Sequence, residues 1–161
     1  MKFLTTIRFD PSDAQVFDQA AEEGEWAVSG AFAFAALPPE ALSGKLRQAF
    51  ANGFLSLDSF GHSTFTSVTG ITDAERARIT DRLADHFVAH YGAPDRAAAR
   101  PTAEEEVAYI ADLCAGLPIG KVVAVSREID DAGQLREAFR TIDKPASCAE
   151  GGAWQIVEAE T

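Results

Sequence analysis

Residues 25–35 read EWAVSGAFAFA, and this alternating stretch decides the fold that we expect. Side chains along a β-strand point to opposite faces with a period of two, so large and small residues here fall on different faces. Because both faces are apolar, the stretch predicts a central strand covered on both sides. The small face would let a helix approach closely, and a ligand groove is the alternative. The large face would hold Trp26, Val28, Phe32 and Phe34, and the small face Ala27, Ser29, Ala31, Ala33 and Ala35.

The residues after this stretch predict a helix and then a hairpin. Pro38 and Pro39 end the strand and open a helix, because the first N–H groups of a helix have no partner in any case. Gly53 is suited to end that helix. Residues 54–58 and 64–68 then read as two strands joined by a turn over residues 60–63. The apolar stripe of the helix recurs at i, i+4, i+7 and i+8, at Leu42, Leu46, Ala49 and Phe50.

Two helices with clear start signals follow. Thr72 and Glu75 form a capping box that begins a helix over residues 72–91. Thr102 and Glu105 form a second capping box, for a helix over residues 102–115. Because the connection between them is short, we expect the two helices to be adjacent. The inward row of the second helix consists of Ala103, Val107, Ile110 and Cys114.

The remaining elements complete an α+β fold. The opening MKFLTTIRFD predicts a first strand, residues 121–129 a later strand, and residues 154–157 a last strand. Between the last two, Asp131 would begin a short helix. We therefore expect a single domain over residues 1–161, with a mostly antiparallel sheet of five or six strands covered by three or four helices. The apolar residues of the short helix are Leu135, Ala138, Phe139 and Ile142.

Composition restricts the partners and the compartment that we expect. The chain has 161 residues and a net charge of −11, without a cluster of Lys and Arg that could neutralise phosphates. Nucleic acid and an anionic membrane surface are therefore not expected partners. No segment reaches the roughly 20 apolar residues of a membrane-spanning helix. Only two cysteines, and no expected signal peptide at the N-terminus, predict a cytoplasmic protein.

His86 and His90 are the strongest indication of a site. A spacing of four residues places both imidazoles on one side of a helix, within reach of one metal ion. On the next helix, Glu106 falls on the inward side. Two histidines and a carboxylate at a helix–helix seam would form a two-His, one-carboxylate metal site. The alternatives are that Glu106 forms a salt bridge with Arg82 or a histidine, faces solvent at a boundary position, or contributes to a subunit contact.

The turn over residues 58–64 combines aspartate, serine and histidine, but it does not predict a hydrolase. Hydrolytic triads are assembled by geometry, usually from distant positions in the sequence. No serine stands in a GxSxG motif, and Gly61 with its neighbouring hydroxyls is typical of a tight turn. Residues 116–121 likewise fail to match a phosphate-binding loop, because the glycine spacing is one residue short.

Four segments of the chain together carry a resemblance to a known family: FLTTIRFDPSD, GEWAVSGAFAFA, GKLRQAFANGFLSLDSFGHSTF and HFVAHYGAPD. They resemble an uncharacterised bacterial protein family that is known only as a domain of unknown function. The resemblance covers most of the chain up to about Phe139. It implies no activity, cofactor or catalytic residue, and it is consistent with a stand-alone cytoplasmic protein.

Two classes of function follow from these patterns. The first is a small, acidic, non-enzymatic binding or accessory protein that forms a homodimer or binds a protein partner, through a groove beside the Ala/Ser face or through a helix surface. The alternative is a metal-binding protein or metal-dependent enzyme that uses His86, His90 and Glu106. We prefer the first class, because no motif supplies a nucleophile, a phosphate cradle or a dense cluster of metal ligands.

Overall fold

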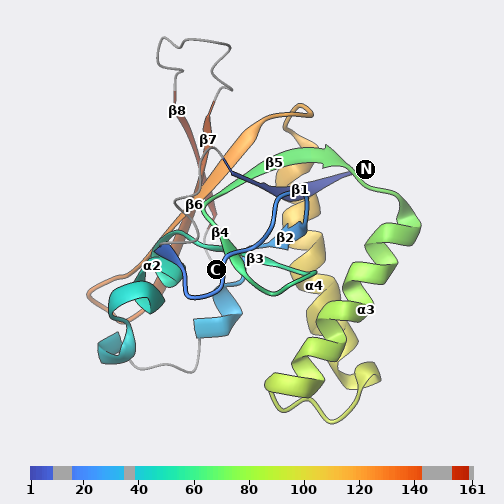
Figure 1. The fold of residues 1–161 in the computed structure, drawn as a ribbon, viewed down its shortest axis with the longest axis horizontal. Helices are drawn as coiled ribbons and strands as arrows, with labels where there is room; N and C mark the ends of the chain where they lie inside the picture. Colours follow the sequence, from blue (N-terminus) through green and yellow to red (C-terminus); the bar gives the residue numbers. More distant parts are fainter. Residues whose placement is uncertain (9–15, 35–38, 143–153, 160–161) are drawn as a thin grey trace.

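The fold is α+β and is built on one curled antiparallel sheet (Figure 1). The computed structural model describes residues 1–8, 16–34, 39–142 and 154–159. The strands are β1 Lys2–Ile7, β2 Trp26–Val28, β3 Phe54–Ser56, β4 His62–Ser63, β5 Phe65–Gly70, β6 Val122–Ile129, β7 Leu135–Ile142 and β8 Trp154–Ala159. Their order in the sheet is β4-β3-β2-β1-β5-β6-β7-β8. The expectation of five or six strands was too low: the described residues form eight, or seven without the two-residue β4.

Three α-helices cover the sheet within the described part of the chain. They are α2 Gly44–Asn52, α3 Asp73–His90 and α4 Arg96–Ala115, and the short 3-10 helices η1 Ala31–Phe34 and η2 Pro39–Ala41 precede them. Helix α4 packs against β1 and β2, α3 packs against α4, and α2 packs against β6 (Figure 1). The adjacency of the two long helices that the short connection predicts is confirmed.

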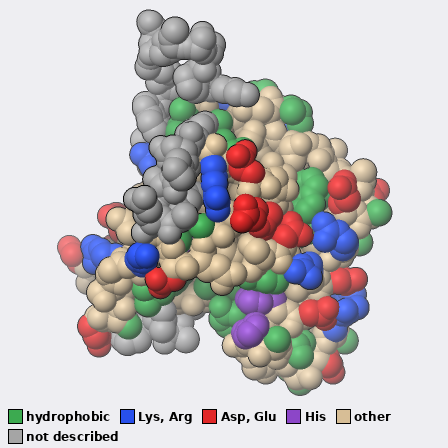
Figure 2. All heavy atoms as spheres, in the orientation of Figure 1, with side chains coloured by type: hydrophobic (Ala, Val, Ile, Leu, Met, Phe, Trp, Pro, Cys, Tyr) green, Lys and Arg blue, Asp and Glu red, His purple; other side chains and the backbone are tan. Residues whose placement is uncertain are grey.

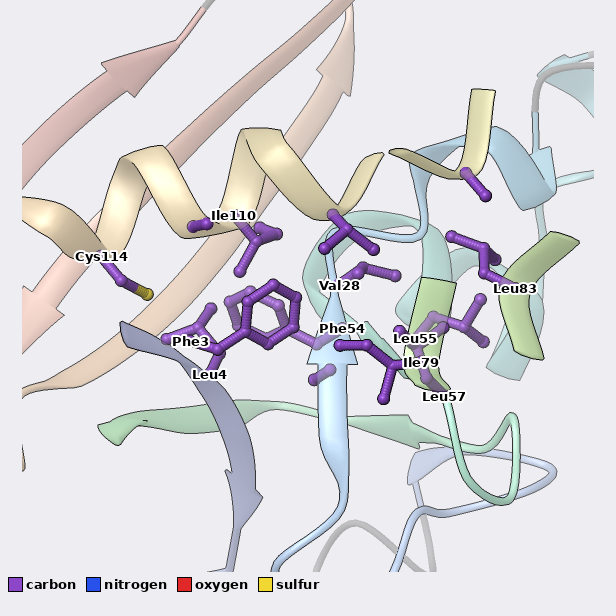
Figure 3. Close-up of a cluster of buried hydrophobic side chains, with 14 of the residues drawn as sticks. Phe3, Leu4, Val28, Phe54, Leu55, Leu57, Ile79, Leu83, Ile110 and Cys114 are labelled. Carbon is purple, nitrogen blue, oxygen red and sulfur yellow. The ribbon is translucent and has the colours of Figure 1, made fainter. Parts of the chain in front are cut away.

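The main core lies between the sheet and the α3–α4 pair. Phe3, Leu4 and Phe54 from the strands meet Ile110 and Cys114 from α4, and all five side chains are buried (Figure 3). Burial raises the pKa of the Cys114 thiol to about 12, so this cysteine is an inert apolar side chain. A second, smaller cluster packs around α2 and consists of Phe17, Phe34, Leu42, Ala49 and Phe50.

The predicted strand over residues 25–35 is wrong in its second half. Strand β2 ends at Val28, and η1 follows it. Gly30 lies between them with a φ of 81°, a conformation that favours glycine. A Cβ atom on Gly30 would lie 2.6 Å from the Cβ atom of Leu55, so the chain turns here against β3. Residues 31–34 therefore leave the sheet, and the expected row of small residues on one strand face does not form.

The short helix predicted after Asp131 is also wrong, because residues 135–142 form strand β7. Apolar residues in this segment match a helical period, but the burial alternates: Glu137, Phe139 and Thr141 are buried. A tight turn with Gly133 at a φ of 80° joins β6 to β7 as a hairpin. The cross-strand pairing overrides the apparent helical pattern.

The starts and ends of the predicted helices were right in part. The capping box of Thr72 and Glu75 is present, and α3 follows it. The second capping box is not used: α4 begins earlier, at Arg96, and the Asp95 side chain caps it by accepting a hydrogen bond from the Ala98 N–H at 2.8 Å. The inward row predicted for α4 is nevertheless buried as expected. Helix α2 begins at Gly44, and Gly53 ends it as predicted.

The predicted hairpin over residues 54–68 forms differently. Strand β3 pairs with the short β4, whereas β5 pairs with β1 and β6. The strands expected at the start and near the end of the chain, β1 and β8, are confirmed, and so is β6. Residues 9–15 and 35–38, which include Phe9 and Pro38 of the expected first strand and first helix, lie outside the described residues. None of the helices in the described part is long and apolar enough to span a membrane.

Candidate functional site

A groove of about 720 Å³ lies between the C-terminal half of α3 and the turn that joins β3 to β4. We call it the histidine groove, because all three histidines of the chain line it. Figure 2 shows histidine side chains together with hydrophobic ones on this face of the molecule. The groove is also lined by Ala33 of η1. Its main polar and aromatic lining residues are Phe60, His62, Arg82, His86, His90 and Tyr91.

Phe60 has an unusual backbone conformation at the centre of this turn. Its φ of 59° is the only positive φ of a non-glycine residue in the described part of the chain. For a bulky side chain this left-handed conformation costs free energy, on the order of 1–3 kcal/mol. Gly61 follows it, and a Cβ atom there would lie 2.8 Å from the backbone of Ala20. The turn is therefore both strained and closely covered.

Hydrogen bonds from two sides hold the turn in this conformation. The buried Glu25 carboxylate accepts hydrogen bonds from Ser56 Oγ at 2.6 Å and from the Ser59 N–H at 3.2 Å. Arg82 of α3 donates to two carbonyl groups of the turn, those of residues 57 and 58, the first from Nε at 2.8 Å. A strained residue persists only where its surroundings determine the conformation more than once, and these contacts do so.

The strained conformation places the Phe60 ring on an imidazole. The rings of Phe60 and His86 stack with centroids 3.9 Å apart and planes only 5° from parallel. The Arg82 guanidinium lies 5.6 Å from the Phe60 centroid, within the range of a cation–π contact. The ring of His90 is 4.8 Å from that of His86. Burial and the neighbouring His90 lower the pKa of His86, so its imidazole is neutral at pH 7.

His62 lies deeper, against the smaller hydrophobic cluster. Its ring centroid is 5.7 Å from that of Phe17 and 6.0 Å from that of Phe34. Burial, together with the positive charge of Arg127, lowers the pKa of His62 to about 4. Its Nε2 atom is buried and has no hydrogen-bond partner among the residues that the structure describes. A buried polar atom without a hydrogen-bond partner costs free energy.

The three predicted metal ligands lie in two different places. His86 and His90 are side by side on the last turns of α3, as their spacing predicts. Glu106 is inward on α4, but there it lies near the charges of Glu137 and Arg127, and burial with the Glu137 charge raises its pKa. The described residues contain no group of three or more side chains that could hold a metal ion. The three groups therefore do not converge, and metal binding itself stays a prediction.

A second set of polar side chains lies between the sheet and the helices α2 and α4. Arg127 and Glu137 are directly opposite in the β6–β7 pairing, and both side chains are 0% exposed. Arg127 Nε donates to Glu137 Oε2 at 2.6 Å. One terminal nitrogen donates to the carbonyl groups of Phe50 at 2.8 Å and Gly53 at 2.9 Å, and the other to the carbonyl of Ser29. Arg127 thus fastens the end of α2 to the sheet.

The Glu137 carboxylate also has several hydrogen-bond donors. Besides Arg127, it accepts hydrogen bonds from Ser29 Oγ at 2.5 Å and from the Tyr109 hydroxyl at 3.0 Å. Burial and the negative charge of Glu137 raise the pKa of Tyr109, so its hydroxyl stays protonated and donates. We call Ser29, Tyr109, Arg127 and Glu137 the arginine network. Its charges and donors satisfy one another, which is the arrangement that a structural role requires.

Sequence reasoning missed the arginine network and the special position of Phe60. A signal for the network existed: Arg127 follows Val123 and Val125 at a period of two, and Glu137 precedes Phe139 at the same period. Read as facing strands, the two segments would have placed both charges on buried faces. The conformation of Phe60 has no comparable signal, because its neighbour Gly61 equally fits an ordinary turn.

Comparison with known proteins assigns the chain to a family but does not indicate an activity. The model of a family described as "Family of unknown function (DUF6505)" matches residues 1–153, which include β1 to β7, the histidine groove and the arginine network. No curated protein and no solved structure matches the chain. Function must therefore be argued from the geometry of the chain itself.

Proposed function

The chain belongs to this family of unknown function, and we propose that it is a cytoplasmic, non-enzymatic binding protein whose ligand lies in the histidine groove. The observation that carries the proposal is the strained Phe60, held at a φ of 59° by contacts from two sides. Strained residues are concentrated at ligand-binding and active sites, where a conformation is fixed in advance of binding. The effect of the strain here is to hold an aromatic ring on His86 inside a groove.

The chemistry of the groove favours an uncharged planar ligand. The lowered pKa values of His62 and His86 keep both imidazoles neutral at pH 7, so they offer hydrogen bonds rather than positive charge. The charged groups are already paired: Arg82 binds the turn, and Asp85 accepts two hydrogen bonds from Arg96 at 2.8 and 2.7 Å. The net charge of −11 opposes an anionic ligand. Exposed rings, such as Tyr91 at 45% exposure, suit stacking.

The same residues favour binding over catalysis. Ser59, the serine of the groove, accepts a hydrogen bond from the Gly61 N–H at 3.2 Å, and no hydrogen bond to an imidazole is found for it among the described residues. A nucleophilic serine needs a general base within hydrogen-bond reach. The role of this hydroxyl is to shape the turn.

Binding of small aromatic probes tests the proposal. Benzamide, indole and phenol are uncharged, and benzoate is the matched anion of the same size as benzamide. We expect benzamide to shift the imidazole NMR resonances of His86 and His90, and benzoate to shift them less. Phe60→Gly should lose this response while remaining folded, because glycine accepts a φ of 59° without strain. Tyr109→Phe, outside the groove, is the control variant and should respond as the wild type does.

Two results would overturn the proposal. The first is that none of the four probes shifts any of the three imidazoles at millimolar concentration. The second is that the folded Phe60→Gly variant responds as strongly as the wild type, since the stacked ring would then have no part in binding.

We also propose that the protein self-associates as a homodimer. Two exposed apolar side chains at the C-terminal end of α3 support this part of the proposal, because surface apolar groups near one another favour association. They are Val88, outside the groove lining and 36% exposed, and Tyr91, at the rim of the groove and 45% exposed. Light scattering tests it: a dimer that Tyr91→Lys converts to a monomer is the expected result. A wild-type monomer at high micromolar concentration would contradict it without affecting the ligand proposal.

A further inference from the structure

His86 and His90 have the geometry of a pair of metal ligands. They are four residues apart on α3, and their ring centroids are 4.8 Å apart. Neither imidazole forms a side-chain hydrogen bond to another described residue. The stack with Phe60 covers a face of the His86 ring, whereas the nitrogen lone pairs lie in the plane of the ring and point outward from its edge. Stacking therefore fixes the orientation of His86 without occupying its nitrogens.

The electrostatic surroundings of the pair favour a cation. His90 is the last residue of α3, and the C-terminal end of a helix carries a partial negative charge from its unpaired carbonyl groups. The net charge of the chain, −11, adds a long-range attraction for cations.

We infer that His86 and His90 together bind one divalent transition-metal ion, with water in its remaining coordination positions. Imidazole nitrogen selects Cu²⁺, Ni²⁺ and Zn²⁺ over Mg²⁺ and Ca²⁺, which prefer oxygen ligands. Glu106 is not part of this site, because it lies beside Glu137 and Arg127. Two protein ligands leave the ion open to a further ligand, so the site is a docking point for a metal or a metal-bound small molecule. The inference does not depend on an aromatic ligand in the groove.

Titration of the metal-free protein with CuCl₂, NiCl₂, ZnCl₂ and MgCl₂, measured by calorimetry, tests the inference. We expect one equivalent of Cu²⁺ to bind, with Ni²⁺ and Zn²⁺ weaker, as the general order of affinities requires, and no Mg²⁺ binding. His86→Ala and His90→Ala should each weaken Cu²⁺ binding at least about tenfold, because each removes one of two protein ligands. NMR of the imidazole nitrogens should show that the ion perturbs these two rings.

A matched control keeps the number of histidines and changes only their spacing. In the double variant Val88→His with His90→Ala, the second imidazole is two residues from His86, on another side of the helix, and Cu²⁺ binding should be as weak as in His90→Ala alone. His62→Leu should bind the ion as the wild type does.

The inference is overturned if the wild type binds no transition metal at micromolar concentration, or if both alanine variants bind as tightly as the wild type. Phe60→Gly separates the two proposals. Loss of benzamide binding with Cu²⁺ retained would support both, whereas failure of the Cu²⁺ titration alone would leave the aromatic ligand standing.

Discussion

The arginine network and the histidine groove both place polar side chains against apolar ones, but they differ in whether the buried polar atoms have hydrogen-bond partners. In the network, the buried Arg127 and Glu137 have hydrogen-bond partners on each side. In the groove, His62 Nε2 is buried without one, and Phe60 has a strained backbone. Polar groups that satisfy one another hold a fold together, whereas unsatisfied and strained ones are retained at a cost in stability. The difference separates a structural centre from a candidate binding site.

Removal of one partner in the network should have the largest effect. Arg127→Met leaves the Glu137 carboxylate buried without its cation, and we expect a loss of about 3–5 kcal/mol in the free energy of unfolding. Urea denaturation measures it. The double variant Arg127→Met with Glu137→Leu should recover part of the loss, because no unpaired charge stays buried. A loss below about 1 kcal/mol in the single variant would show that the network is not structural.

Acid should destabilise the fold through His62. The pKa of His62 is about 4 in the folded chain and near its usual 6.5 in the unfolded chain, so protons bind the unfolded state first as the pH falls. Between pH 6.5 and pH 4 the wild type should therefore lose about 3 kcal/mol more than His62→Gln, which cannot titrate. Denaturation curves across this range measure the difference. Parallel curves for the two proteins would mean that His62 titrates normally and is accessible to water.

The tyrosine of the network should contribute a smaller amount. Tyr109→Phe removes the hydroxyl that donates to Glu137 Oε1 at 3.0 Å and leaves the ring in place against Phe139. We expect a loss of about 1 kcal/mol, the usual contribution of a hydrogen bond whose acceptor keeps its other partners. Urea denaturation at pH 7.5 checks this value. A variant as stable as the wild type would exclude Tyr109 from the network.

Glu106→Gln should have the smallest effect, and it should be stabilising. Burial and the charge of Glu137 raise the pKa of Glu106, so protonation of this side chain is more favourable in the folded chain than in the unfolded chain. As the pH rises above the usual carboxyl range, the unfolded chain ionises first and the fold loses stability. The substitution removes this loss, so the gain, well below about 1 kcal/mol, should be seen at pH 7.5 and not at pH 4. A loss at pH 7.5 would instead indicate a structural ion pair.

Local signals in the sequence predicted local structure in part, since the capping box of Thr102 and Glu105 does not begin a helix. The capping box of Thr72 and Glu75 began a helix as expected, and the helical period alone brought His86 next to His90. Both depend only on residues within one or two turns of each other. The antiparallel α+β architecture also followed from the pattern of strands and helices, although the number of strands did not.

Other predictions that depended on neighbouring elements failed, although the adjacency of α3 and α4 was predicted correctly. Glu106 is inward on α4 as its position on the helix indicates, but it lies near Arg127 of β6 and Glu137 of β7 and not with the histidines of α3. The apolar residues of β7 match a helical period and so predict a helix, and only the pairing with β6 decides between the two structures. Without β7 the arginine network could not be predicted, since Glu137, the partner of Arg127, lies on this strand.

The stability of His62→Leu at pH 7.5 tests the contrast between the two regions most directly. If the imidazole is retained for a ligand and not for the fold, replacing it with an apolar side chain removes an unsatisfied buried atom. The free energy of unfolding should then rise by about 1 kcal/mol. A decrease of similar size in the free energy of unfolding would show that His62 supports the structure as Arg127 does. It would contradict the assignment of the groove as a binding site.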